Sequence, residues 1–108
     1  MTVEDPLIVV LCTVPDEATA ERLAKGLVEE RLAACVNAIP GVKSFYRWQG
    51  KVETDTETQL LIKTRSERFD ELAAWISANH PYEVPELIAI PADRVSDAYF
   101  AWAVEQTS

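Results

Sequence analysis

A long β-hairpin is the feature that most constrains the fold of this chain. Side chains alternate with a period of two from Cys35 to Thr64, and Gln49-Gly50 stands near the middle of this segment. Glycine readily adopts the positive φ that a two-residue hairpin turn requires. A hairpin of about thirty residues in a chain of 108 leaves room for few other elements. The turn predicts three facing pairs: Trp48 with Lys51, Tyr46 with Glu53, and Ser44 with Asp55.

The two arms of this hairpin differ in character. Pro40-Gly41 interrupts the first arm, and since proline cannot donate to a β-ladder, an edge strand or a bulge is expected there. The second arm alternates acids and threonines over Val52–Thr58 before the apolar Leu60-Leu61-Ile62. Its polar half cannot lie against the helices of a core. The three acids Glu53, Asp55 and Glu57 are interpreted as a solvated stripe that deters aggregation, or alternatively as a weak attractor of cations.

The remaining segments alternate between strand and helix patterns. Leu7–Val14 is a continuous apolar run rich in branched residues, typical of a central strand covered on both faces. Capping residues then predict three helices: one from Asp16 to about Leu32, one from Ser66 that ends before Pro81, and one from Ser96. A short strand is expected over Glu86–Pro91.

This order of elements predicts the fold class. The order β-α-β-β-α-β-α is that of an α+β, ferredoxin-like split βαβ domain over residues 1–108. Such a domain has a four-stranded antiparallel sheet in the order 4-1-3-2, helices on one face, and here a further C-terminal helix. Cys12 is then expected near the loop His80–Glu86, whereas Cys35 lies two strands away. A disulfide between the two cysteines is not expected.

Charge and cysteine content limit the function. The formal net charge is -8, which repels phosphate backbones and anionic lipid, so nucleic acid and membrane are not expected as partners. The longest apolar run, Leu7–Cys12, is too short to span a membrane, and no basic segment precedes a cleavage site. Two cysteines without CxxC spacing suit free thiols in a reducing compartment. A cytoplasmic protein is expected.

Cys12 and His80 are the soft-ligand pair that the fold would bring together. A thiolate with an imidazole suits copper or zinc, and Glu83 and Glu86 offer additional oxygen ligands. The alternative is that Cys12 is a core residue and His80 the end of a helix. Catalysis is not expected, because the chain has one histidine and no GxSxG, HExxH or phosphate-binding glycine loop.

Large aromatic side chains are too numerous for the rim of so small a monomer. Because aromatics concentrate at interfaces, some are expected to be covered by another chain. Packing against the last helix is the alternative, which suits Trp102 better than the hairpin residue Trp48. The five aromatics are Phe45, Tyr46, Trp48, Tyr82 and Trp102.

Segments spread along the chain resemble the CutA divalent-cation tolerance protein family from Val9 to Trp102. The matching segments are Val10-Leu-Cys-Thr13 with Pro15-Asp16, Leu32-Ala-Ala-Cys35-Val-Asn37 with Pro40, Ser44, Tyr46-Arg-Trp48 with Gly50-Lys51, Glu57, Lys63-Thr64, His80-Pro-Tyr82 and Pro85-Glu86-Leu87.

The resemblance implies a cytoplasmic homotrimer, without catalytic activity, that is linked to tolerance of copper and other divalent cations. It also implies a copper site at Cys12 and Asn79-His80, where the family pattern has a second histidine in place of Asn79. Glu86 or water would complete this site. The architecture further resembles the trimeric PII-like signal proteins. The alternative hypothesis is therefore a small-molecule sensor or protein-interaction module that uses clefts between subunits, lined by Tyr82, Glu86, Lys63 and Trp48.

Overall fold

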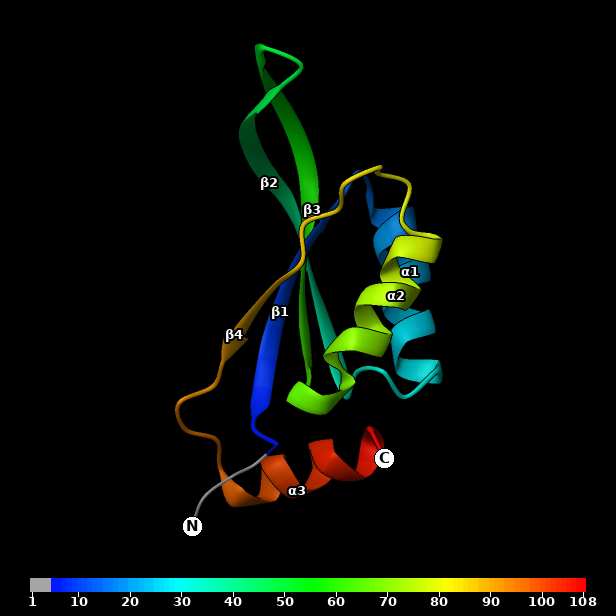
Figure 1. Cartoon of the computed structure of the whole chain (residues 1–108), viewed down its shortest axis with the longest axis vertical. Helices are drawn as coiled ribbons and strands as arrows, with labels where there is room; N and C mark the ends of the chain where they lie inside the picture. Colours follow the sequence, from blue (N-terminus) through cyan, green and yellow to red (C-terminus); the bar gives the residue numbers. More distant parts are fainter. Residues whose placement is uncertain (1–4) are drawn as a thin grey trace.

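The computed structural model describes residues 5–108 and contains one four-stranded sheet packed against helices (Figure 1). All neighbouring strands are antiparallel, and their order across the sheet is β2-β3-β1-β4. Both the fold class and the strand order predicted from the sequence are therefore confirmed. The elements are β1 (Leu7–Val14), α1 (Glu17–Glu29), β2 (Cys35–Trp48), β3 (Lys51–Arg65), α2 (Phe69–Asn79), β4 (Ile88–Pro91) and α3 (Asp97–Gln106).

Helices α1 and α2 lie side by side on one face of the sheet, and α3 lies at the end where β1 begins (Figure 1). The hydrophobic core fills the space between the sheet and the first two helices. No helix within residues 5–108 is long and apolar enough to cross a membrane. The largest fully buried aliphatic side chains are Val10, Val14, Leu23, Leu27, Leu60, Ile62, Leu72 and Ile76.

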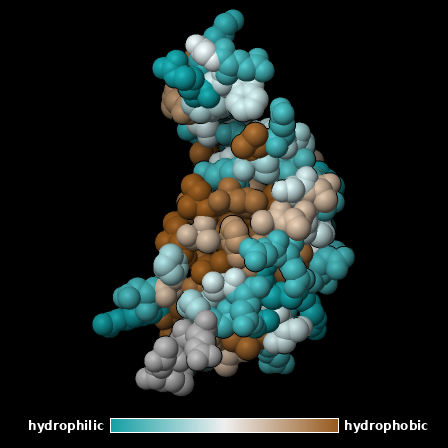
Figure 2. Space-filling model, in the orientation of Figure 1, coloured by the Kyte–Doolittle hydropathy of each residue, from teal (hydrophilic) through white to brown (hydrophobic). Residues whose placement is uncertain are grey.

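The other face of the sheet, called here the open sheet face, is apolar, and helices α1 and α2 do not lie upon it; within residues 5–108, α3 covers only its end, where Leu7 packs with Ala103 (Figure 1). Ile39, Ile88 and Ile90 are 45%, 50% and 47% exposed. Figure 2 shows hydrophobic residues gathered over the middle of the molecule. In a single chain β1 is buried on both faces only at Leu7 and Ile8; beyond Ile8 only alternate residues are buried, and not both faces as expected. The strand register places Val9, Leu11, Ile39, Leu61, Ile88 and Ile90 on this face.

The hairpin of β2 and β3 projects well beyond the helices and gives the molecule its length of 48 Å (Figure 1). All three predicted pairs occur in the register. Gln49 and Gly50 have φ of 49° and 79°, as a type I′ turn requires at both central positions. The expected bulge lies between Ile39 and Val42, where Gly41 has a φ of 74°.

The ends of the helices follow the sequence signals with two corrections. Asp16 caps α1 by accepting a hydrogen bond from the Thr19 N–H at 2.7 Å. This helix ends at Glu29 and not near Leu32, because Arg31 adopts a left-handed φ of 58°. Ser66 does not cap α2: residues 66–68 form a 3₁₀ turn, and the Asp5 carboxylate accepts from the Glu67 N–H at 2.8 Å.

Candidate functional site

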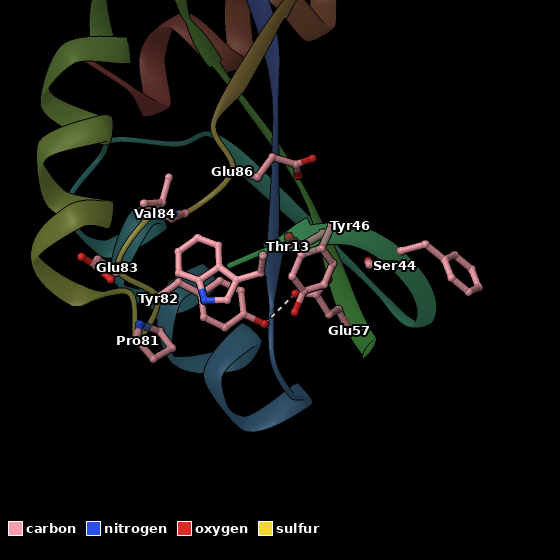
Figure 3. A pocket seen from close by; sticks show the side chains of 12 residues that line it. Thr13, Ser44, Tyr46, Glu57, Pro81, Tyr82, Glu83, Val84 and Glu86 are labelled. Carbon is pink, nitrogen blue, oxygen red and sulfur yellow. Dashed lines mark hydrogen bonds between the residues drawn. The ribbon is translucent and has the colours of Figure 1, made fainter. Parts of the chain in front are cut away.

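A pocket of about 790 Å³ lies between the base of the hairpin and the loop that follows α2 (Figure 3). Its walls come from three parts of the chain: the end of β1, both hairpin arms, and residues 81–86. The strand register places Thr13, Ser44, Tyr46 and Glu57 on the open sheet face. The pocket therefore exists because the loop crosses the sheet from the helices to β4.

His80 fixes the start of this loop. Its Nε2 lies 2.9 Å from the Thr13 carbonyl oxygen, and its Nδ1 accepts a hydrogen bond from the Tyr82 N–H at 3.0 Å. A carbonyl oxygen can only accept, so Nε2 must carry the proton and Nδ1 the lone pair. The ring is 8% exposed and lies 4.8 Å from the Tyr82 ring, centroid to centroid. His80 thus joins the end of α2 to the end of β1.

Tyr82 and Glu57 form the centre of the pocket. The Tyr82 hydroxyl donates to the Glu57 carboxylate at 2.5 Å (Figure 3). Burial raises the pKa of Tyr82, and the hydrogen bond to Glu57 raises it further. Glu57 is only 6% exposed, and Tyr82 is its sole hydrogen-bond partner among the described residues. The other oxygen of this carboxylate has no partner among the described residues and is accessible from the pocket.

A second tyrosine–acid pair lies next to the first along the hairpin. The Tyr46 hydroxyl donates to Asp55, which raises the pKa of Tyr46 to about 12. Trp48, two residues further along the strand, also lines the pocket and is 44% exposed. The lining includes carboxylates and aromatic rings but no lysine, arginine or histidine. The pocket is therefore both acidic and aromatic.

The four residues predicted as metal ligands lie near this pocket but have other partners. Cys12 is fully buried, with its Sγ 3.9 Å from the Thr13 carbonyl oxygen that His80 also contacts. Burial, then Glu86 and Glu57, raise the pKa of the Cys12 thiol to about 12. Asn79 donates its amide to the Trp75 carbonyl oxygen at 2.8 Å, and Glu86 accepts from the Gln59 amide at 3.5 Å.

In the single chain, these donors are not arranged around a common metal position. Between residues 5 and 108, no three His, Cys, Asp or Glu side chains are grouped so as to hold a metal. Both nitrogens of His80 have partners, and the raised pKa of the Cys12 thiol favours its protonated form. A metal would require His80 to leave Thr13 or Tyr82. The four-residue site stays a prediction of the sequence.

The structure places Glu57 differently from the interpretation of its sequence pattern. Glu57 was assigned to a solvated stripe, but the loop after α2 covers it; its position just before the apolar end of the arm was the available signal. Within one chain, Lys63 does not line the pocket with Tyr82, Glu86 and Trp48, so its place in a cleft between subunits stays a prediction. It lies six residues beyond Glu57 on the same strand, which is about 20 Å away.

Comparison with known proteins identifies relatives over nearly the whole chain. The profile of the family described as CutA1 divalent ion tolerance protein matches residues 8–106. The divalent-cation tolerance protein CutA of Thermus thermophilus is 52% identical over 99 residues, which cover 92% of this chain and 96% of that protein. The chloroplastic protein CutA of Arabidopsis thaliana is 47% identical over 102 residues, or 94% of this chain. The chain spans only 56% of that plant relative.

Solved structures agree with the sequence comparison. CutA1 from Oryza sativa superposes with a TM-score of 0.93 at 47% identity, over 95% of this chain and 94% of that chain. Sequence and structure thus lead to one family over the same residues. The chain belongs to the CutA1 divalent ion tolerance protein family.

Proposed function

We propose that this chain acts as a homotrimer in the tolerance of divalent cations. The open sheet face supports the assembly, because a contiguous apolar face on a soluble chain is usually covered by a partner. On the hairpin, Phe45 and Val52 are also 69% and 68% exposed. Membership of the CutA1 family supports the role in cation tolerance.

A closed cyclic assembly suits the edges of this sheet. β2 and β4 are the two edge strands, and each has one side without a strand partner in the described chain. Three copies related by a three-fold axis allow each edge to meet a neighbour without leaving a free edge to continue the assembly. We propose that the projecting hairpins make these contacts.

Sedimentation equilibrium tests the trimer. The expected mass is three times the 12.1 kDa subunit, and a single-subunit mass at every concentration would contradict the proposal. Ile90→Asp, on the open sheet face, should lower the mass. Val28→Asp is the matched control, because Val28 is 44% exposed, close to the 47% of Ile90, but lies on α1. This control should leave the mass unchanged.

Copper is the cation that we propose, and its site at Cys12 and His80 has a direct test. The formal charge of -8 and the common contact of both residues with Thr13 support a cation here. Cys12→Ser and His80→Ala should each weaken copper binding about tenfold or more, whereas Cys35→Ser should not. Copper isotherms that are unchanged in both variants would exclude the site. That result would leave the trimer proposal standing.

We further propose that the chain is a single domain, cytoplasmic, and without catalytic activity. Both cysteines are free, which suits a reducing compartment. The buried thiol and the fully bonded histidine are not arranged as a nucleophile and its base. Thiol counting in denaturant without reductant should find two thiols per chain.

The aromatic, acidic pocket favours a second candidate function, that of a small-molecule sensor or interaction module of PII-like architecture. Its volume of about 790 Å³ is in the range of small-molecule sites. A metabolite panel screened by thermal shift tests this function. A saturable shift that does not depend on Cys12 would support it, and the absence of any shift would contradict it.

A further inference from the structure

We propose that the pocket between the hairpin and the loop after α2 binds a small organic cation of the quaternary ammonium type. This inference rests on the second candidate function, the binding of a small molecule in a cleft between subunits, so the pocket stays accessible when a neighbouring copy covers the rest of the open sheet face. It names the chemical class of the ligand, which the family resemblance leaves open.

The first step of the argument is the buried carboxylate of Glu57. Burial of a carboxylate is costly unless the charge is compensated. Tyr82 satisfies one oxygen of Glu57, the other oxygen opens into the pocket, and no basic side chain of the described residues lines the pocket. Glu86 adds a second negative charge on the other side of Thr13 (Figure 3). A bound cation would supply the compensation that the described chain does not.

The second step is the aromatic lining. The rings of Tyr46 and Tyr82 lie close to the Glu57 carboxylate (Figure 3), and Trp48 also lines the pocket. An aromatic face attracts a cation within about 6 Å of its centroid, and tryptophan does so most strongly. Aromatic rings around a carboxylate form the kind of cage that recognises a quaternary ammonium group.

The third step excludes a bare metal ion as the occupant. A hard divalent cation needs about six converging oxygen ligands, but Glu57 and Glu86 lie on opposite sides of Thr13 and the Glu83 carboxylate points away from them (Figure 3). The volume of about 790 Å³ is also that of a molecule. A methylated ammonium needs no hydrogen-bond acceptors, and its methyl groups suit apolar walls such as Val84 and Pro85.

Titration calorimetry of the full chain with two matched probes tests the proposal. Choline is the cation, and 3,3-dimethylbutan-1-ol is its neutral isostere with a carbon in place of the nitrogen. Choline should bind saturably and at least about tenfold more tightly than the isostere, and its affinity should fall with rising salt. Equal binding of both probes would overturn the proposal.

Variants locate the binding. Glu57→Gln and Trp48→Ala should each weaken choline binding about tenfold. Trp102→Ala is the control for Trp48: it is 43% exposed compared with 44%, but it lies on α3 at the other end of the molecule (Figure 1). Glu105→Gln, also on α3, is the control for the lost charge. Unchanged choline affinity in Trp48→Ala overturns the proposal even if Glu57→Gln fails to fold.

The remaining outcomes separate this inference from the functions on which it rests. If another metabolite binds and choline does not, the pocket is a small-molecule site but the ligand class is wrong. A third outcome is that choline does not bind and Glu57→Gln changes the oligomeric mass. Glu57 would then pair with a basic side chain of a second copy in the assembly, which also overturns the inference. Copper affinity should not change in Trp48→Ala, so failure of the copper site is a separate result.

Discussion

The Tyr82 hydroxyl donates a 2.5 Å hydrogen bond to the Glu57 carboxylate, and this bond joins two residues 25 positions apart in the sequence. Glu57 belongs to β3, and Tyr82 to the loop between α2 and β4. A hydrogen bond to an ionised acceptor is stronger than one between neutral groups. The bond therefore holds the loop over the base of the hairpin and sets the shape of the pocket.

Tyr82→Phe should lower the free energy of unfolding by about 1–3 kcal/mol, because Glu57 remains buried and loses its partner. Urea denaturation followed by circular dichroism at one protein concentration measures the change. The variant retains the aromatic ring and its contact with His80. The loss of stability therefore measures the contribution of the hydroxyl group.

Tyr46→Phe is the matched control for this variant. It also removes a tyrosine–carboxylate bond, that to Asp55, but Tyr46 is 40% exposed and water can replace the hydroxyl. Its effect should be below about 1 kcal/mol. A larger loss for Tyr46→Phe than for Tyr82→Phe would contradict the central position of the Tyr82–Glu57 bond.

The tyrosines of the native protein should titrate late in alkali. The pKa of Tyr46 is raised to about 12, chiefly by its bond to Asp55, and burial raises the pKa of both Tyr82 and Tyr99. In the unfolded chain all three titrate near 10. The native state holds these protons more tightly, so their contribution to stability is complete below pH 10 and is lost as the pH rises through the native values.

Tyrosinate absorbance at about 295 nm follows this titration. At pH 11 the native protein should show far less tyrosinate than the same protein in denaturant. Tyr46→Phe should remove one late-titrating group. Coincident curves for native and denatured protein would show that none of the three hydroxyls is held as described.

Local patterns of the sequence were enough to predict most of the fold. The period of two and Gln49-Gly50 specify the hairpin register, because a two-residue turn permits one pairing only. The Pro40-Gly41 bulge follows in the same way. The prediction that Ser66 caps α2 was wrong. The Glu67 N–H donates instead to Asp5, which comes from a distant part of the chain. Sequence spacing contains no signal for such a contact.

The candidate site was less predictable for the same reason. The topology brings Cys12 and His80 to Thr13, as the strand order implies. The partners of the His80 ring depend on the path of the loop, which periodicity does not define. Glu57 looks like any acid of an exposed stripe until that loop covers it. A tight turn lets the sequence predict which strand residues pair. The hydrogen-bond partners that a loop brings together can be identified only from the structure.

Gly26 should not tolerate a side chain while Trp75 is present. A Cβ at Gly26 would lie 2.5 Å from two carbons of the Trp75 ring, so the ring would have to move. Crowding of this kind destabilises a protein by about 1–3 kcal/mol. Replacing glycine by alanine inside a helix stabilises it by only about 0.5–1 kcal/mol, so the crowding outweighs the gain. Gly26→Ala should therefore destabilise the protein by about 1 kcal/mol in chemical denaturation.

A double-mutant cycle identifies the cause of that loss. In a Trp75→Leu background the crowding is removed, and Gly26→Ala should then stabilise α1 by about 0.5 kcal/mol through helix propensity. The sign of the effect thus depends on Trp75. If Gly26→Ala is destabilising to the same extent in both backgrounds, the contact with Trp75 is not what requires glycine.

The Cys12 thiol should be nearly inert in the native protein. Burial, together with the charges of Glu86 and Glu57, raises its pKa to about 12. Only the thiolate is nucleophilic, so at pH 8 the reactive fraction is about one in ten thousand, against roughly one in four for a free thiol. Alkylation by iodoacetamide, located by mass spectrometry, should be at least about a hundredfold slower at Cys12 in native than in denatured protein.

Glu86→Gln tests the electrostatic part of this protection. Removal of the acid lowers the Cys12 pKa but leaves the thiol buried, so the alkylation rate should rise by less than about tenfold. Glu105→Gln, which removes a charge on α3, should leave the rate unchanged. Rapid alkylation of Cys12 in the unmodified protein would mean that the thiol is accessible and ionisable. That result would contradict the buried position of Cys12 and favour its prediction as a metal ligand.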